Sequence, residues 1–327
     1  MIQYDLDHRW LAQEVTPESP PWKYSGINIC EELYEYRKNR YTAIEMEYIF
    51  NEHLNSHNNS LQLYTDCSKT EEGVAFCYQI DENLHSSKIQ SISSNFTAEL
   101  YAIEEGINHV NQNSDSEMVV VLSDSKSAIQ LIDKFNCKNP IVQKIMNTIT
   151  ISGKTYSFCW VPSHCDINGN EIADSGARNA TRNEVIIEKP ILRNDMKTRI
   201  KRNSMLRWNN KWRDTALNNK LRFIKDTTSP FALSNFTDRQ WERVVCRLRI
   251  GHTALTHGYL MDGGVQPTCE HCGALLTVLH MLYFCPNLAP HRNYFGTMTY
   301  GELLTNHVQL NGILHNYLRT TGLLNLI

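Results

Sequence analysis

The chain of 327 residues predicts an α/β domain with a mixed, five-stranded sheet flanked by helices, followed by a mostly helical region. Two observations predict the sheet. Three segments with the composition of strands follow one another between residues 61 and 93, and the continuous apolar run at 118–122 is typical of a central strand buried on both faces. The length leaves room for a second domain beside one that buries a full core.

The elements of this domain follow in order from residue 60 onwards. We expect strands first, then helices that alternate with two further strands, as judged from composition and from the spacing of apolar residues. The expected strands span 61–66, 73–80, 84–93, 118–124 and 154–162, and the expected helices span 95–110, 125–135, 140–150 and 168–180.

The segments on either side differ from this domain in composition. The prolines of PESPPWKYSG favour extended chain, so the first segment is expected to be a connector, although 41–54 have helical apolar spacing. Helical periodicity returns over 194–249. We therefore expect a connector at 1–57, the α/β domain at 58–182, a basic helical region at 183–264, a cysteine- and histidine-containing module at 265–290 and a C-terminal tail at 291–327.

The net charge of −3 conceals a strong asymmetry along the chain. Residues 1–180 carry a net charge of −12, residues 181–260 carry +10, and residues 261–327 carry −1. A basic block suits a polyanionic partner such as nucleic acid, because each neutralised phosphate releases counterions. The alternative is a solvated helical surface, and charge alone does not decide between the two.

Nothing in the sequence predicts a membrane protein or a secreted one. The longest apolar stretch, 273–284, contains His280 and is too short to cross a bilayer. The first ten residues lack the basic and apolar regions of a secretory signal. We therefore expect an intracellular protein, nuclear or cytoplasmic, whose ten cysteines, scattered except for three near the end, do not form a disulfide framework.

Four acidic residues stand where solvated surface charge is not expected. Asp66 ends the first strand, Glu99 lies beside the apolar face of the first helix, Asp124 directly follows the central strand, and Asp174 lies inside the last helix. Open α/β sheets place their ligand sites at the carboxyl ends of such strands. Taken singly, Asp124 could be a helix N-cap and Glu99 a surface acid.

Four carboxylates at one end of a sheet would repel one another unless cations lie among them. Their hard oxygen ligands suit Mg²⁺ or Mn²⁺ rather than zinc. Two such ions can activate a water and stabilise the leaving oxygen in phosphodiester hydrolysis.

The motifs around these carboxylates resemble those of the type I ribonuclease H family. LYTDCSK carries Asp66, SNFTAELYAI carries Glu99, VVVLSDSKSAI carries Asp124, and WVPSHCDINGNEIAD carries His164 and, ten residues later, Asp174. The match is closest to the ribonuclease H domains in polyproteins of jockey-like non-LTR retrotransposons. The resemblance implies a ribonuclease H-like fold and a metal-dependent endonuclease that cleaves the RNA strand of RNA–DNA hybrids, leaving 5′-phosphate and 3′-hydroxyl ends.

The resemblance also implies a role for each residue. Asp66 would bridge two Mg²⁺ or Mn²⁺ ions, Glu99 and Asp124 would complete the ion site on the leaving-group side, and Asp174 would hold the ion that activates water. Glu99 would also contact the ribose 2′-hydroxyl that distinguishes RNA from DNA. His164 would assist proton movement or product release, the alternative being a structural loop histidine.

One residue departs from the family's pattern. Cys67 stands where the family usually has glycine, and a side chain there could crowd the nucleic-acid backbone. This departure leaves open a second interpretation, a non-catalytic nucleic-acid-binding protein that keeps the fold. A third interpretation is an interaction module whose C-terminal region binds protein.

A second cluster of metal-binding residue types lies near the C-terminus. Cys269, Cys272, His280 and Cys285 have the spacing C-x2-C-x7-H-x4-C, which predicts a closed, tetrahedral, structural Zn²⁺ site. The alternatives are buried cysteines without a metal, and His271 or His291 as the imidazole ligand.

The second half also resembles the retrotransposon proteins. The spacing of the cysteines and histidine in those proteins favours His280, rather than His271 or His291, as the imidazole ligand. RLRIGHTALTHGYLM and PTCEHCGALLTVLHMLYFCP are similar to the region that follows ribonuclease H there, and PPWKY is similar to the tail after their reverse transcriptase. The resemblance implies the C-terminal portion of such a polyprotein, without a reverse transcriptase domain, and a basic 183–264 region that contacts nucleic acid.

Overall fold

The structure is a computed structural model of the chain, and two compact units, Met1–Arg199 and Ile200–Ile327, are described separately. It describes residues 11–13, 20–36, 41–134, 136–163, 165–215, 219–229, 238–295, 297–305 and 308–327.

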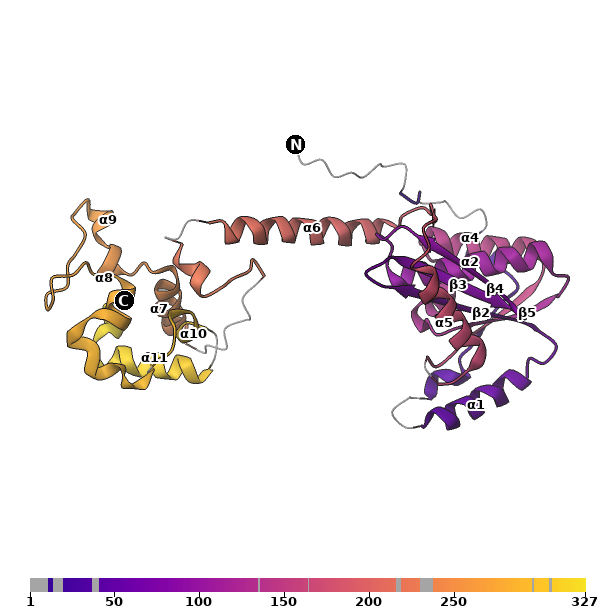
Figure 1. The fold of residues 1–327 in the computed structure, drawn as a ribbon, viewed down its shortest axis with the longest axis horizontal. Helices are drawn as coiled ribbons and strands as arrows, with labels where there is room; N and C mark the ends of the chain where they lie inside the picture. Colours follow the sequence, from indigo (N-terminus) through magenta and orange to yellow (C-terminus); the bar gives the residue numbers. More distant parts are fainter. Residues whose placement is uncertain are drawn as a thin grey trace. The chain divides into compact units, whose positions relative to one another are not determined.

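The first unit is built on a mixed sheet, which confirms the predicted fold class (Figure 1). The strand β2 is antiparallel to β3, which is antiparallel to β4, whereas all other neighbours are parallel. The strands, in their order across the sheet, are β1 (Ile27–Cys30), β6 (Thr155–Trp160), β5 (Met118–Ser123), β2 (Leu61–Lys69), β3 (Val74–Ile80), β4 (Asn83–Ile89) and β7 (Ile186–Ile187).

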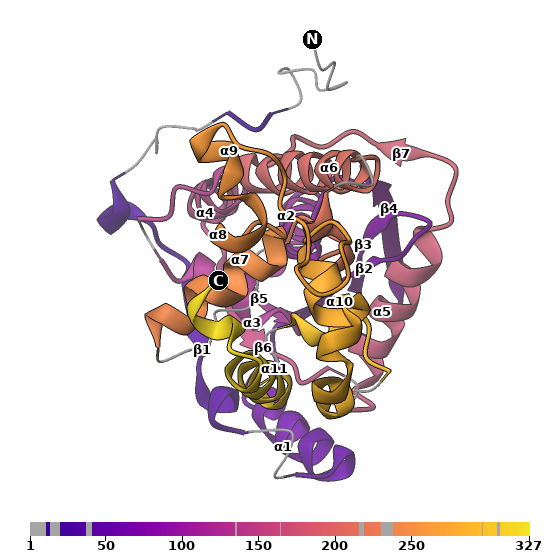
Figure 2. The same ribbon diagram turned by 90° about the vertical axis from the view of Figure 1, so that its left-hand side faces the viewer.

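The sheet has seven strands, two more than the five predicted, because β1 and β7 extend its two edges. Strand β1 has four residues and β7 has two, too few to show the alternation that identifies a strand in a sequence. Figure 2 shows β7 beside β4. Residues 27–30, expected in a connector, thus belong to the sheet.

Three helices cover one face of the sheet, and they are α2 (Asn95–Asn113), α3 (Lys126–Ile132) and α4 (Pro140–Ser152). Their predicted apolar faces are buried in the main core together with residues from β2, β5 and β6. Ser94 caps α2, because its side chain accepts a hydrogen bond from the backbone N–H of Thr97, and Gly153 ends α4 in a left-handed conformation.

Two helices lie on the opposite face, α1 (Ala43–Asn55) and α5 (Asn168–Ala180) (Figure 1). Helix α1 begins with a capping box in which Thr42 and Glu45 satisfy each other's backbone N–H groups. Its Met46 and Phe50 pack with Val120 and Leu122 of β5, while α5 contacts β2, β3 and β4.

The segment after α5 is also attached to this unit. The hydroxyl of Tyr101 donates a hydrogen bond to the carbonyl of Pro190, and Leu192 is part of the main core. The Asp195 carboxylate accepts hydrogen bonds from the backbone N–H of Ser94 at 3.2 Å and from Thr97 Oγ1 at 2.6 Å. The compact unit therefore extends past 182, the expected end of the domain.

The second unit is mostly helical and has its own core. Helix α6 (Arg193–Arg213) begins in the first unit, and α7 (Arg239–Ile250) contributes Trp241, Val244, Val245 and Leu248 to the second core. The helices α6 and α7 confirm part of the helical prediction for 194–249, while 216–218 and 230–237 lie outside the described residues.

The remaining helices of the two units are short apart from α11. They are η2 (Pro21–Lys23), η3 (Glu32–Glu35), η4 (Lys220–Phe223), α8 (Ala254–His257), α9 (Tyr259–Asp262), the π-helix η5 (His280–Phe284), η6 (Pro286–Tyr294), α10 (Tyr300–Leu303), α11 (Val308–Thr320) and η7 (Leu323–Asn325). Among the described residues, none of the helices is long and apolar enough to cross a membrane.

Candidate active site and metal centre

Asp66 lies in the middle of the sheet, on β2 between β5 and β3. Its side chain is 5% exposed, and Oδ1 accepts a 2.6 Å hydrogen bond from the backbone N–H of Cys67. Burial raises the pKa of Asp66 to about 8, and the nearby Asp124 carboxylate adds to this rise. Such an acid is costly to ionise unless a positive charge is brought to it.

Glu99 lies on the face of α2 that is buried against the sheet, so it is not a solvent-exposed surface acid. It is 7% exposed, and its buried Oε2 has no hydrogen-bond partner among the described residues. Burial, followed by the charges of Asp66 and Asp124, raises the pKa of Glu99 well above its ordinary value. An unpartnered carboxylate oxygen in this position is suited to a cation.

A glycine explains how α2 comes so close to the sheet. A Cβ atom added at Gly106 would lie 2.7 Å from Leu63 Cδ1, well inside van der Waals contact. Glycine costs about 1 kcal/mol relative to alanine inside a helix, and here it allows α2 to pack directly on β2. Gly106 lies seven residues, about two turns, after Glu99 and hence on the same side of the helix.

Asp124 follows β5, so its position depends on where that strand ends. Its carbonyl accepts a 3.0 Å hydrogen bond from Trp160 Nε1, and the carbonyl of Ser123 accepts one from the backbone N–H of Val161 at 2.9 Å. These bonds from the end of β6 fix the turn that carries the carboxylate.

The structure brings Asp66, Glu99 and Asp124 together. Their ligand oxygens all lie within 4.8 Å of one another, although the residues come from β2, α2 and the end of β5. Three carboxylates at this distance fit one or more divalent cations with a preference for oxygen, such as Mg²⁺ or Mn²⁺. The orphaned Glu99 oxygen and the raised pKa of Asp66 are the observations that support this fit.

Asp174 lies outside this group of three. It is on α5, on the other face of the sheet, and its Oδ2 accepts a 2.7 Å ion-paired hydrogen bond from Arg178, one turn later. It is nevertheless near enough for its charge to contribute to the raised pKa of Asp66. Asp174 therefore borders the three carboxylates and is held by a cation from the chain itself.

Another acid at the site, Glu171, was not among the residues predicted from the sequence. Its charge also contributes to the raised pKa of Asp66. The sequence could have predicted Glu171, because it precedes Asp174 by three residues on a helix and so lies on the same face of that helix. His164, by contrast, lies outside the described residues.

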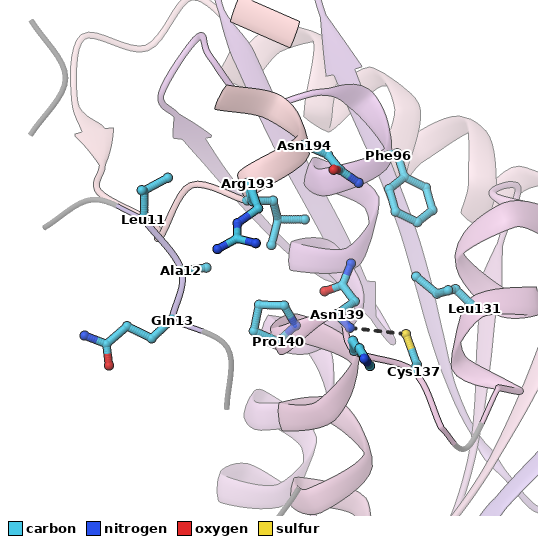
Figure 3. Close-up of a pocket in the computed structure, with 12 residues that line it drawn as sticks. Leu11, Ala12, Gln13, Phe96, Leu131, Cys137, Asn139, Pro140, Arg193 and Asn194 are labelled. Atoms are coloured by element: carbon cyan, nitrogen blue, oxygen red, sulfur yellow. Dashed lines mark hydrogen bonds between the residues drawn. The ribbon is translucent and has the colours of Figure 1, made fainter. Parts of the chain in front are cut away.

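A pocket of about 730 Å³ lies elsewhere on the first unit (Figure 3). Phe96, Leu131 and Pro140 supply apolar surface, and the backbone N–H of Asn139 donates a 3.4 Å hydrogen bond to Cys137 Sγ there. None of the candidate catalytic carboxylates lines it. The candidate active site is therefore defined by the carboxylates, not by this cavity.

The second unit brings Cys269, Cys272, His280 and Cys285 together. Their ligand atoms lie within 4.8 Å of one another, with Cys269 Sγ 3.8 Å from Cys285 Sγ and Cys272 Sγ 3.5 Å from His280 Nε2. A tetrahedral Zn²⁺ with its usual bond lengths places ligand atoms about 3.3–3.8 Å apart. The four residues could hold zinc.

The backbone around these residues has the form of a tight turn. The carbonyl of Cys269 accepts a 2.8 Å hydrogen bond from the backbone N–H of Gly273, which has a φ of +70°. The backbone N–H of His271, followed by the His280 side chain, lowers the pKa of Cys269 to about 6, which favours the thiolate. The group includes neither His271 nor His291, the two alternative ligands.

Some basic side chains of the 183–264 region are exposed, and others are held inside the second unit by hydrogen bonds. On α6 the basic side chains are exposed, and Trp208 is 63% exposed among them. On α7, Arg249 is buried and donates a 2.7 Å hydrogen bond from Nε to the carbonyl of Leu304, while Arg247 donates to the carbonyl of Ile327. Arg249 thus stabilises the second unit, whereas the basic side chains of α6, together with Arg239 and Arg243 of α7, are exposed.

Carboxylates gathered in this way at the centre of a mixed sheet could hold divalent cations, and such ions are used in phosphodiester hydrolysis. Residues 58–182 match the family model described as RNase H. This stretch is therefore an RNase H domain, which indicates a nuclease that acts on RNA–DNA hybrids. A comparison with curated proteins found no match for the chain.

Proposed function

We propose that the RNase H domain is a metal-dependent endonuclease that hydrolyses the RNA strand of RNA–DNA hybrids by a two-metal mechanism. The convergence of Asp66, Glu99 and Asp124 within 4.8 Å is the observation that carries this proposal. Two bound Mg²⁺ or Mn²⁺ ions would supply an activated water and stabilise the charge that develops on the leaving 3′-oxygen.

The positions of the three carboxylates suggest a different role in metal binding for each of them. Glu99 interacts electrostatically with both Asp66 and Asp124, and Asp66 also interacts with Asp124 and Asp174. As the resemblance implies, Asp66 would bridge both ions. Glu99 and Asp124 would hold the ion on the leaving-group side. The Oε2 atom of Glu99, which has no described partner, would also orient the ribose 2′-hydroxyl and so select RNA.

Asp174 would hold the ion on the side of the attacking water. Its ion pair with Arg178 is partly exposed, so the exchange of this partner for a divalent ion costs little. Arg178 would then be free to contact a phosphate of the substrate. His164 would assist proton movement or release of the product.

The basic region and the zinc centre would support this activity. We assign the exposed positive charge within 183–264 to contacts with the phosphates of the substrate. Cys269, Cys272, His280 and Cys285 would hold a structural Zn²⁺ that stabilises the fold around them. The sequence resemblance supports an origin in the C-terminal part of a jockey-like retrotransposon polyprotein.

A labelled RNA–DNA hybrid tests the proposal directly. The full chain is expected to cleave the RNA strand when Mg²⁺ is supplied and to leave both strands intact without it. The products should carry 5′-phosphate and 3′-hydroxyl ends, and duplex DNA of the same sequence should persist. Cleavage that is independent of divalent ions, or that ignores the RNA strand, would contradict the two-metal assignment.

Cys67 supports a second candidate function, binding of nucleic acid without cleavage. Its Sγ lies 3.3 Å from the carbonyl of Asn95 on α2, and burial, with the neighbouring Glu99, raises the pKa of this thiol. The thiol therefore occupies space beside a candidate metal ligand. Hybrid binding without cleavage, at any concentration of Mg²⁺ or Mn²⁺, would favour this function.

A third candidate is an interaction module in the second unit that binds protein. Equal affinity of the full chain and of the first unit for the hybrid would favour it, because the second unit would then add nothing to nucleic-acid binding.

A further inference from the structure

A second group of cysteines and histidines lies in the first unit, away from the C-terminal cluster in the sequence. Cys30, His53, His57 and Cys159 have their ligand atoms within 4.8 Å of one another. Cys30 ends β1, Cys159 lies on β6, His53 is in the last turn of α1, and His57 follows that helix. None of these residues belongs to the RNase H carboxylate site.

The fold determines how the four residues meet. Strands β1 and β6 are parallel neighbours, and Cys30 is in register with Cys159. His53 and His57 are four residues apart at the end of a helix, so their side chains lie on one side, with ring centroids 5.5 Å apart. Helix α1 packs over the face of the sheet onto which both cysteines project.

The four potential ligand atoms of this group lie close together and are largely enclosed. Cys30 and Cys159 are 7% and 1% exposed, and Cys30 Sγ lies 3.8 Å from His57 Nε2. His53 Nε2 is buried and has no hydrogen-bond partner among the described residues. A buried ring nitrogen without a partner is costly in an apolar core.

We propose that Cys30, His53, His57 and Cys159 form a structural Zn²⁺ site. Two thiolates and two imidazoles arranged around one point are a donor set that selects zinc, whereas Mg²⁺ and Ca²⁺ require oxygen ligands. Two thiolate charges neutralise the ion, so the site as a whole is uncharged. Neutrality suits a site enclosed by Met46, Phe50 and the apolar residues around them.

The site accounts for how β1 and α1 are held on the RNase H domain. Only Met46 and Phe50 of α1 are fully buried, while Ile44 and Tyr48 are 77% and 67% exposed. Ile49 and Leu54 pack against the same cluster but are only partly buried, so packing leaves much of α1 exposed. A zinc ion would join the end of α1 and the end of β1 to β6 by metal–ligand bonds.

Zinc content provides the first test. The full chain is purified without chelators, dialysed against buffer that contains a trace of Zn²⁺ and a thiol reductant, and its zinc is measured by elemental mass spectrometry. His57→Ala is expected to contain one zinc fewer per chain than the parent. The matched controls His109→Ala and Cys137→Ser alter residues outside both groups and should retain the zinc content of the parent.

The C-terminal cluster serves as an internal reference. Cys272→Ser should remove a different zinc, so that Cys272→Ser combined with His57→Ala contains two fewer than the parent. Equal zinc content in the parent and His57→Ala would overturn the proposal. An intact mass that is lower by the two hydrogens of a Cys30–Cys159 disulfide, in protein kept under reductant, would also overturn it.

A conservative variant of His57 distinguishes a role as a zinc ligand from a role in packing alone. His57→Cys replaces one zinc ligand by another, so it should restore the zinc that His57→Ala loses. Hydrogen exchange of residues 43–55 should be fast in His57→Ala and slow in His57→Cys, while the amides of α2 are protected in both. Failure of His57→Cys to recover zinc would overturn the proposal.

Discussion

The carboxylate cluster and the C-terminal cysteine–histidine cluster differ in how the chain builds them. Asp66, Glu99 and Asp124 come from a strand, a helix and the end of another strand, and only the packed sheet brings them together. Cys269, Cys272, His280 and Cys285 come from one short segment organised by a turn. The first site depends on a whole domain, whereas the second can be formed locally once an ion is present.

The two clusters differ equally in chemistry. Burial disfavours the charged forms of Asp66 and Glu99, so their ionisation opposes folding until a cation binds. Thiolates and imidazole around zinc stabilise the fold that holds them. We therefore expect changes at the first site to alter activity, and changes at the second to alter the stability of the second unit.

The largest expected effect is the loss of cleavage in Asp66→Asn and Asp124→Asn. A neutral amide cannot help hold two divalent ions, so the rate of hybrid cleavage should fall by at least about 100-fold. Circular dichroism and the zinc content should match those of the parent. A variant Asp66→Asn that cleaves at the parental rate would show that the ions lie elsewhere.

The next effect is local unfolding of the second unit in Cys272→Ser. If these residues hold zinc as proposed, loss of one of the four ligands should abolish the fold around 265–290, because binding of a structural zinc is coupled to folding. Hydrogen exchange should show this loss in the second unit, while the rate at saturating hybrid stays that of the parent. Cleavage that disappears together with the zinc would mean that the two clusters do not act independently.

A smaller effect is expected when the second unit is removed. A fragment of residues 1–199 holds every proposed catalytic group and has a net charge of −10. It should therefore cleave the hybrid, but at low salt it should bind the hybrid about 10-fold more weakly than the full chain does. The slope of log affinity against log salt concentration should be steeper for the full chain. Equal slopes would exclude nucleic-acid binding by the second unit.

The fourth effect is on stability. In the absence of divalent ions, Asp66→Asn is expected to be more stable than the parent. The raised pKa of Asp66, about 8, means that the folded state binds more protons than the unfolded state between about pH 4 and pH 8. Stability therefore falls as the pH rises through this window. Asp66→Asn should raise the free energy of unfolding at pH 8 by about 1–3 kcal/mol.

Urea unfolding at pH 6 and pH 8 in the absence of Mg²⁺ measures this effect. The exposed Asp133→Asn is the matched control and should leave the pH dependence of stability as it is in the parent. An Asp66→Asn variant that loses stability at pH 8 would show that the carboxylate is charged and stabilised in the metal-free fold.

The smallest expected effect concerns Cys67. If its side chain crowds the substrate, Cys67→Gly should increase the rate of hybrid cleavage about threefold, which is less than 1 kcal/mol in the barrier. Cys137→Ser, at another partly exposed cysteine, should not alter the rate. An unchanged or lower rate in Cys67→Gly would show that the site tolerates the larger residue.

The central fold and the proximity of Asp66, Glu99 and Asp124 could be predicted from the sequence for a physical reason. Strands β2 to β6 are long enough to show strand composition, and Asp66, Glu99 and Asp124 lie inside or beside apolar runs where an acid is conspicuous. The candidate zinc ligands near the C-terminus could be recognised because they are close in sequence. The clustering of Cys269, Cys272, His280 and Cys285 in space agrees with their spacing.

Other features could not be predicted because their partners are distant in the sequence. Strands β1 and β7 have four and two residues and are strands only because β6 and β4 pair with them. Cys30 and Cys159 are isolated cysteines until this pairing places them in register. The spacing of His53 and His57 at the end of a helix was the only local signal for that group.

The pairing of β1 with β6 has a consequence for the behaviour of the domain in solution. Tyr156 of β6 donates a 2.7 Å backbone hydrogen bond to Gly26, and Tyr156 and Phe158 are buried. Without β1, β6 would present a row of unpaired backbone groups flanked by apolar side chains, a template for edge-to-edge aggregation. Strand β1 covers this side of β6 and, with four residues, is itself a short edge strand, which limits edge-to-edge pairing between copies.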